Sequence, residues 1–221
     1  MQTEDARARI LRSAKEIFLE QGYKKATIRQ IVRRSGLMIG SIYHFFENKE
    51  DIFRQLFLDI FDRCDGLICQ RFGCPADAPL RLALMCSTML QAAEMDENIC
   101  ELYGELLSLQ GSAELHALHF SEWMRANLPE ELGGQSEAEV FARSLAVSGI
   151  LRGLLANQYH QLRLPLRDRM RIMIESSFTI LGISPGRAAE ITAQLDGLME
   201  DMAAIAGELV ERQEPVPVGN R

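Results

Sequence analysis

The chain has 221 residues, enough for a small domain beside one larger core, and its 47% hydrophobic content is typical of a globular protein. It contains no run of about 18 apolar residues and no apolar segment near its start, so we expect a cytoplasmic protein without a membrane span or a signal peptide. Its five cysteines are an odd number, which argues against a secreted disulfide framework and predicts reduced thiols.

Charge divides the chain into a basic beginning and an acidic remainder. Residues 1–54 hold 11 Lys and Arg against 7 Asp and Glu, a net charge of +4. The other 167 residues hold 13 against 24, a net charge of −11, and together these give the −7 of the whole chain. DNA repels an acidic protein in most orientations, so the basic beginning predicts an encounter with DNA through the N-terminal end.

The basic part is expected to form three short helices around a shared core. An apolar stripe marks the first helix, which we expect to end near Gly22, a residue type common at helix C-termini. The stripe consists of Ile10, Leu11, Ala14, Ile17 and Phe18. Thr27, followed three residues later by Gln30, predicts a capping box and the start of a second helix.

A third helix is predicted after Gly36, which supplies the flexible backbone of a tight turn. Its inward side is marked by apolar residues spaced at i, i+3 and i+4, namely Ile42, Phe45 and Phe46. The opposite side then carries Gly40, Ser41, Tyr43 and His44. Such a pair of helices is typical of a helix-turn-helix, and this outward face can enter a major groove.

The segments ILRSAKEIFLEQGYKKATIRQIVRRSG and GSIYHFFENKEDIF resemble the DNA-binding region of the TetR (tetracycline repressor) family, over residues 7–54. The matching features are Phe-x-x-x-Gly-Tyr in the first helix, Thr27 opening the second, and the run from Tyr43 to Lys49. The resemblance implies that Thr27, Tyr43 and Lys49 hold phosphates and that the rest of the outward face lies against the bases. The predicted DNA-binding residues are Thr27, Arg29, Ile39, Gly40, Ser41, Tyr43, His44 and Lys49.

Two positions depart from the family pattern. Met38 and Ile39 stand where such proteins carry Ser or Thr followed by a polar or basic residue. The missing cap hydroxyl costs about 1 kcal/mol of helix stability and one phosphate contact. Two interpretations remain open: packing in the three-helix core, which the helical wheel favours, or contact with thymine methyl groups in the groove.

Beyond Lys49 the pattern is helical throughout, and we expect an all-α fold. The predicted domains are a helix-turn-helix domain over 1–49, a larger helical effector-binding and dimerisation domain over 50–213, and a disordered tail over 214–221. Helices are expected at about 50–72 and 136–162, and from near 79, 97, 112, 165 and 185. An apolar repeat from Ile191 to Leu209 predicts one final amphipathic helix.

Small residues on the helix predicted at 136–162 point to a close helix–helix contact, since glycine inside a helix costs about 1 kcal/mol relative to alanine. The family resemblance implies that the last long helices pair two subunits as a four-helix bundle. The predicted interface residues are Gly149, Gly153, Ala156 and Phe178. Packing within one chain is the alternative. A homodimer would favour a palindromic operator.

Aromatic and methionine side chains gather in the segments that form the effector pocket in similar proteins. The predicted effector-binding residues are Phe61, Met85, Met89, Tyr103, Phe120 and Trp123, although each of these also suits an ordinary core. A different sensor would use Cys64, Cys69 and Cys74, together with Cys86 or Cys100, against oxidants or a soft metal, but no Cys-x-x-Cys spacing occurs.

The resulting hypothesis is a homodimeric transcriptional repressor that an apolar small molecule releases from double-stranded DNA. An activator, a redox or metal-responsive regulator and an architectural DNA-binding protein remain alternatives. We find no phosphate-binding glycine loop, nucleophile elbow or His-Glu-x-x-His zinc motif, so we predict neither an enzyme nor a bound cofactor or metal.

Overall fold

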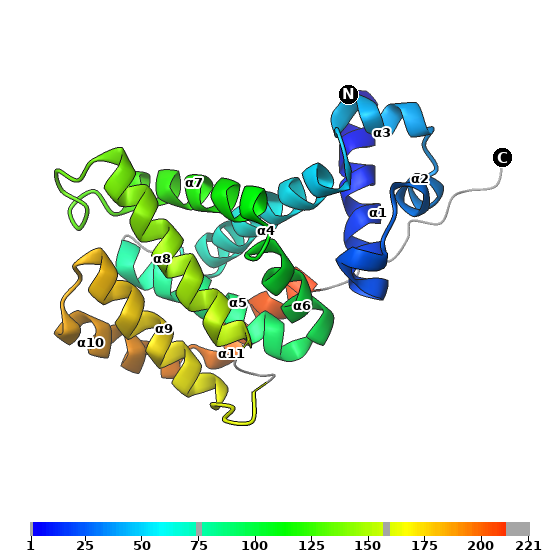
Figure 1. Cartoon of the computed structure of the whole chain (residues 1–221). Helices are drawn as coiled ribbons and strands as arrows, with labels where there is room; N and C mark the ends of the chain where they lie inside the picture. The colour runs from blue at the N-terminus through cyan, green and yellow to red at the C-terminus, as the bar shows by residue number, and fades with distance from the viewer. Residues whose placement is uncertain (1, 74–76, 157–159, 211–221) are drawn as a thin grey trace.

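The computed structural model describes residues 2–73, 77–156 and 160–210, and its regular elements there are eleven α-helices (Figure 1). No strand occurs within those ranges, which confirms the expected all-α class. Helices α1–α3 form a small N-terminal head that projects from a larger body made of α4–α11 (Figure 1). None of the described helices is both long and apolar enough to cross a membrane.

The head consists of α1 (Gln2–Lys25), α2 (Ile28–Ser35) and α3 (Ile39–Phe45). The apolar stripe of α1 is buried, and Gly22, with a non-helical φ of 78° and ψ of 158°, interrupts the helix where the sequence predicted its end, so a kink separates the last residues of α1 from the rest. A guanidinium N–H of Arg9 on α1 donates to the carbonyl of Ser35 at 2.6 Å, which satisfies one of the free carbonyls at the end of α2. These contacts fix α2 and α3 on α1.

The body is organised around α5, of whose 18 residues twelve are buried. Helices α4, α6, α8, α9, α10 and α11 all contact it. The bounds of these elements are α4 Lys49–Phe72, α5 Ala78–Met95, α6 Glu97–Leu106, α7 Gln110–Asn127, α8 Glu137–Ala156, α9 Leu166–Leu181, α10 Pro185–Asp196 and α11 Met199–Val210. A fully buried guanidinium, that of Arg169 on α9, pairs with Glu94 on α5.

Two expected helices end earlier than the sequence pattern indicated. Helix α8 stops at Ala156, and residues 160–162 are not helical. The single helix expected from Ile191 to Leu209 is divided into α10 and α11, because the N–H of Gly197 bonds to the carbonyl of Gln194 and the chain turns there. The turn lets α11 pack on α5 and α4. The tail predicted to be disordered, 214–221, lies outside the described residues.

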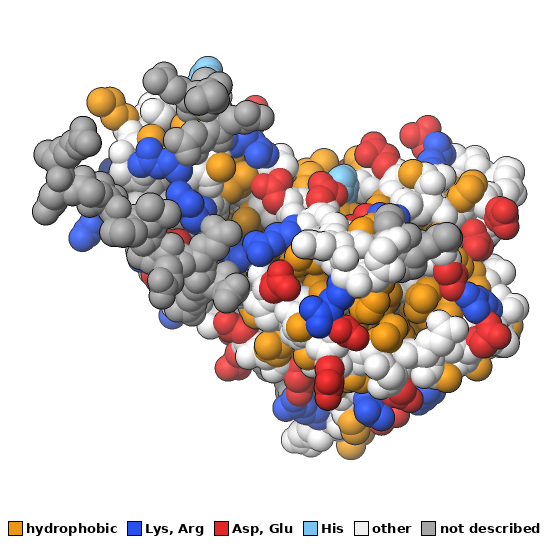
Figure 2. Space-filling view, turned by 180° about the vertical axis from the view of Figure 1, so that it is seen from behind, with side chains coloured by type: hydrophobic (Ala, Val, Ile, Leu, Met, Phe, Trp, Pro, Cys, Tyr) orange, Lys and Arg blue, Asp and Glu red, His pale blue; other side chains and the backbone are white. Residues whose placement is uncertain are grey.

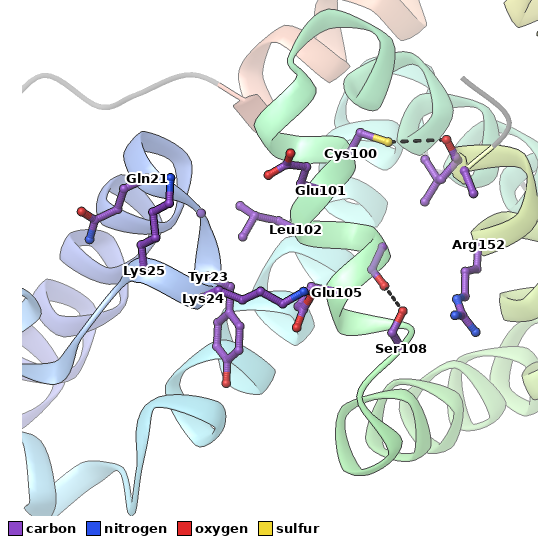
Figure 3. Close-up of a pocket in the computed structure, with 14 residues that line it drawn as sticks. Gln21, Tyr23, Lys24, Lys25, Cys100, Glu101, Leu102, Glu105, Ser108 and Arg152 are labelled. Atoms are coloured by element: carbon purple, nitrogen blue, oxygen red, sulfur yellow. Dashed lines mark hydrogen bonds and ion pairs between the residues drawn. The ribbon is translucent and has the colours of Figure 1, made fainter. Parts of the chain in front are cut away.

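Cations join the head to the body at two places. On one side the ammonium of Lys15 on α1 donates to the carbonyl of Leu209 at 2.9 Å; beside it, within the body, Arg63 on α4 donates to the carbonyl of Glu208 at 3.0 Å. Both cations therefore lie at the negative end of α11. On the other side Lys24 reaches across a groove to Glu105 on α6 at 3.0 Å (Figure 3). The groove has a volume of about 620 Å³ and lies between α1, α6 and α8.

Candidate DNA-binding face and effector cavity

Helix α3 presents a polar face to solvent because its apolar side is held in the core of the head. Ile42 is fully buried and Phe46, which follows the helix, is only 4% exposed. Gly40, Tyr43 and His44 are exposed on the other side, while Ser41 is half-buried. The predicted outward face therefore exists, with Ser41 at its margin.

Met38 and Ile39 extend this face and do not pack inside the head. Their side chains are 82% and 49% exposed, so the interpretation that they fill the three-helix core is wrong. Met38 is the N-cap residue of α3 and has an extended backbone, with φ −77° and ψ 151°, so it precedes the first helical turn and the helical wheel does not place it. Exposed apolar groups thus stand at the start of α3.

Basic and hydrogen-bonding groups surround α3 on the head. Thr27 and Arg29 are exposed at the start of α2. The hydroxyl of Thr27 donates to Oε1 of Gln30 at 2.8 Å and accepts from the N–H of Gln30 at 3.3 Å, which confirms the capping box. Figure 2 shows Lys and Arg side chains over the head and most of the Asp and Glu side chains over the body.

Lys49 has a structural role that the sequence pattern did not indicate. Its Nζ donates to the carbonyls of Tyr23 and Ala26 at 2.8 and 3.0 Å and lies 4.2 Å from the centre of the Tyr23 ring. Burial lowers the pKa of this ammonium. Lys49 therefore ties the start of α4 to the last turn of α1, and these bonds compete with the phosphate contact that the family resemblance implied.

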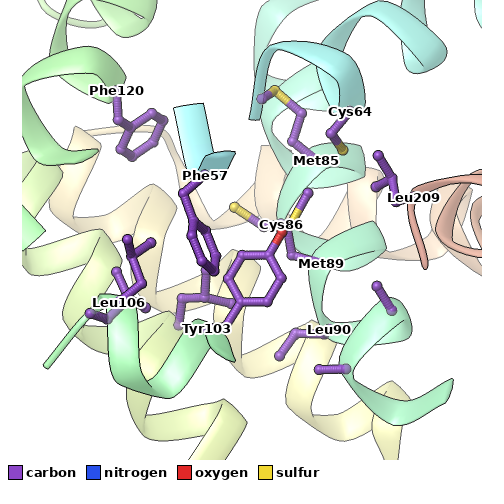
Figure 4. Close-up of a cluster of buried hydrophobic side chains, with 14 of the residues drawn as sticks. Phe57, Cys64, Met85, Cys86, Met89, Leu90, Tyr103, Leu106, Phe120 and Leu209 are labelled. Atoms are coloured by element: carbon purple, nitrogen blue, oxygen red, sulfur yellow. Dashed lines mark hydrogen bonds between the residues drawn. The ribbon is translucent and has the colours of Figure 1, made fainter. Parts of the chain in front are cut away.

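The predicted effector residues meet at one cavity in the body, with a volume of about 50 Å³. Five of the six line it, and Figure 4 shows four of these, Met85, Met89, Tyr103 and Phe120, within the cluster of buried hydrophobic side chains. Trp123 is not among the lining residues, because its indole N–H donates to Asp65 on α4 at 3.1 Å. The other lining residues are Phe57, Leu82, Cys86, His116, Val147, Ser148, Leu151 and Met173.

Polar atoms are few in this cavity. Nδ1 of His116 lies 3.4 Å from the hydroxyl of Ser148, and burial lowers the pKa of His116 to about 4. The hydroxyl of Tyr103 donates to the thioether sulfur of Met89 at 2.6 Å (Figure 4), and burial raises the pKa of that hydroxyl. At neutral pH the imidazole of His116 and the hydroxyls of Ser148 and Tyr103 are therefore uncharged.

Two of the candidate sensor cysteines are poorly placed for reaction with oxidants, whereas Cys69 is partly exposed. Cys64 and Cys86 are buried, and burial raises the pKa of both thiols, that of Cys86 to about 12. Since the thiolate is the reactive form, these groups are weak nucleophiles at neutral pH. Cys74 lies outside the described residues, and within the described ones no three His, Cys, Asp or Glu side chains could hold a metal ion. The surroundings of Cys64 and Cys86 therefore do not favour a role for these two thiols in redox sensing.

An apolar strip of small residues runs along the exposed side of α8. Gly149, Gly153 and Ala156 are exposed, and an added Cβ at either glycine would meet no atom within 4 Å. The glycines are therefore not explained by packing inside this chain. Phe178 differs, because it is 1% exposed and belongs to the core of the body, which removes it from the surface open to a partner.

Comparisons with known proteins give a family match for the head and a structural likeness for the whole fold. Residues 10–56 match the model of bacterial regulatory proteins of the tetR family. The chain is 26% identical over 102 residues to the uncharacterized HTH-type transcriptional regulator YdgC of Bacillus subtilis, covering 44% of this chain and 52% of that protein. It is 25% identical over 97 residues to the HTH-type transcriptional repressor KstR2 of Rhodococcus jostii, covering 44% and 48%.

The chain thus spans about half the length of these curated relatives. Over the whole fold it is similar to the crystal structure of RolR in complex with its ligand resorcinol, with a TM-score of 0.64 and 16% identity, covering 86% of this chain and 94% of that one. At that identity the likeness concerns the arrangement of the helices.

Proposed function

We propose that this chain, whose residues 10–56 match the tetR family of transcriptional regulators, is a homodimeric repressor released from a palindromic operator by an apolar effector. We place the domain boundary at residues 49 and 50, in the first turn of α4. We further propose that it acts in the cytoplasm, without enzymatic activity.

The observation that carries this proposal is the exposed face of α3. Gly40 allows close approach, Tyr43 and His44 offer hydrogen-bonding groups, and the net charge of +4 over residues 1–54 attracts phosphates. Helix α2 ends at Gly36, whose φ of 65° makes the tight turn into α3. In this geometry α3 is the recognition helix and α2 crosses the backbone.

Dimerisation through α8 supports recognition of a palindrome. The strip of Gly149, Gly153 and Ala156 allows two helices to approach closely, and Leu145, 40% exposed, adds an apolar side chain beside it. A two-fold axis through this strip relates the two heads. Half-sites are then expected about 34 Å apart, one turn of the duplex.

Effector release is supported by the position of α4. This helix carries Phe57 and Phe61 into the cavity, and its first residue, Lys49, is bonded to the end of α1 in the head. A ligand that displaces α4 would change the position of the head. The ligand can shift the equilibrium only by binding the released form better than the DNA-bound form.

The first test is to incubate the purified chain with fragmented genomic DNA from its source, recover what binds at moderate salt, and sequence it. We expect enrichment of a palindrome. Tyr43→Ala should lose the enrichment, whereas Arg171→Ala, which removes an exposed charge on α9 in the body, should retain it. Equal recovery of all sequences by the unaltered chain would refute operator binding and leave nonspecific association.

Repression is tested by placing a reporter gene downstream of the enriched palindrome. Expression that falls when the chain is present supports a repressor, which is also what KstR2 of Rhodococcus jostii is named. Expression that rises instead would show an activator with the same recognition helix.

A further inference from the structure

Few polar side chains line the effector cavity. Thirteen described residues line it, and none of them is Lys, Arg, Asp or Glu. Among these lining residues, only Tyr103, His116 and Ser148 carry a nitrogen or oxygen atom in the side chain. Apolar pockets with a few placed polar groups are typical of small-molecule sites, where the polar groups select the ligand.

His116 and Ser148 form a pair that is complementary to a hydroxyl group. If the hydroxyl of Ser148 donates to Nδ1, the other ring nitrogen keeps the proton as a donor and the serine oxygen remains an acceptor. If Nδ1 carries the proton instead, the other nitrogen accepts and the serine proton is free to donate. Either tautomer leaves one donor and one acceptor, and a ligand hydroxyl needs one of each.

A charged ligand would find no counter-ion in this cavity. A carboxylate would lose its hydration without meeting a cation, since the cavity is lined by no Lys or Arg and His116 is neutral. An ammonium would likewise meet no carboxylate among the lining residues. Burial of an unpaired charge is far more costly than burial of a hydroxyl with partners, so the cavity favours neutral molecules.

The size of the cavity restricts the ligand further. Its volume of about 50 Å³ is well below the roughly 150 Å³ of an engineered cavity that holds benzene, so some side chains must move. Met85, Met89 and Met173 line it, and methionine side chains adapt readily. A shift of Met89 would also remove the sulfur that Tyr103 now bonds, leaving that hydroxyl to a ligand oxygen.

From these features we infer that the effector is a small, neutral compound with a hydroxyl group, which His116 and Ser148 bind. The inference rests on the proposed function only in calling this ligand the effector. Binding to the cavity can be measured without DNA.

The experiment titrates the free full-length chain with toluene, phenol, benzoate and benzylammonium in a calorimeter. Phenol should bind about tenfold more tightly than toluene, as expected of a well-formed hydrogen bond, and the two ions should bind more weakly than toluene. Benzoate that binds as tightly as phenol would overturn the inference. So would the absence of binding by all four compounds.

Two variants assign the preference to the polar pair. Ser148→Ala and His116→Phe should each remove the preference for phenol over toluene, and continued binding of toluene to each variant shows that its cavity is intact. His119→Phe is the matched control on α7, because His119 pairs with Asp62 at 2.7 Å and does not line the cavity. Retention of the preference in both Ser148→Ala and His116→Phe would place the hydroxyl elsewhere and overturn the inference.

DNA release separates this inference from the proposed function. Phenol that binds the cavity but leaves the operator complex intact would refute the role as effector and retain the ligand class. Release by benzoate and not by phenol would support a ligand-responsive repressor and overturn the inferred ligand.

Discussion

Replacement of Met38 should abolish a contact with the methyl group of thymine. The side chain is 82% exposed at the start of the recognition helix and is preceded by the turn at Gly36. An apolar group in this position gains by covering the C5-methyl of thymine, which uracil lacks. We therefore expect at least one thymine in each half-site opposite Met38.

The magnitude follows from burial of one methyl group in each half-site. Removing a methyl from water contributes about 0.8 kcal/mol, so two half-sites give about 1.6 kcal/mol, or roughly a 15-fold change in Kd. Substitution of uracil for that thymine in both half-sites should weaken binding of the unaltered chain by this factor. For Met38→Ala the same substitution should have little effect, since the coupled group is already absent.

Fluorescence anisotropy with the enriched operator, at one fixed salt concentration, measures the four affinities of this cycle. Leu118→Ala is the control, because it shortens an exposed apolar side chain on α7 in the body, and it should show the full loss on uracil substitution. An equal uracil effect in Met38→Ala and in the unaltered chain would refute the contact. Absence of any thymine whose methyl matters would refute it as well.

Three further predictions concern the head, the dimer and the cavity. Lys49→Met should lower the free energy of unfolding by about 1 to 3 kcal/mol in chemical denaturation, because the carbonyls of Tyr23 and Ala26 lose their donor. The variant should leave the salt dependence of DNA binding unchanged, whereas a flatter salt dependence would show that Lys49 contacts a phosphate. Gly149→Leu should give monomers in sedimentation without loss of stability, since no atom lies within 4 Å of the added Cβ and leucine is favoured over glycine in a helix by about 0.8 kcal/mol. A dimer that persists in this variant would place the interface elsewhere. The pKa of His116 is lowered in the folded chain to about 4, so the unfolded chain binds the proton first as the pH falls. The free energy of unfolding should therefore fall between pH 7.5 and 5, by at most about 2 kcal/mol, and solvent screening of the partly exposed residue reduces this loss. Denaturation curves of His116→Phe should lack this loss.

The helix-turn-helix could be predicted because its signals are local. The capping box of Thr27 and Gln30, the turn at Gly36 and the spacing of Ile42 and Phe46 each depend on residues within about one helical turn of one another. Such short-range geometry is nearly independent of the rest of the fold. The family resemblance rests on the same segment, which is why it covers only the head.

Only some of the residues that line the candidate cavity could be predicted, and for a different reason. Met85, Met89 and Tyr103 are large apolar side chains on helices that the hydrophobic pattern already located, so their burial together followed from amphipathicity. The pairing of His116 with Ser148 could not follow in this way. Those residues are 32 positions apart, on α7 and α8, and their contact depends on the crossing of the two helices.

The helical class, the order of most helices and the outward face of α3 could be predicted from local patterns, because they depend on periodicity and capping within short segments. The exposure of Met38, the bonds of Lys49 to the end of α1, the burial of Phe178 and the outward position of the glycines of α8 became known from the packed structure. Each of these outcomes depends on which helices pack together and at what angle. That packing is set by contacts between residues far apart in the chain, which no local pattern specifies.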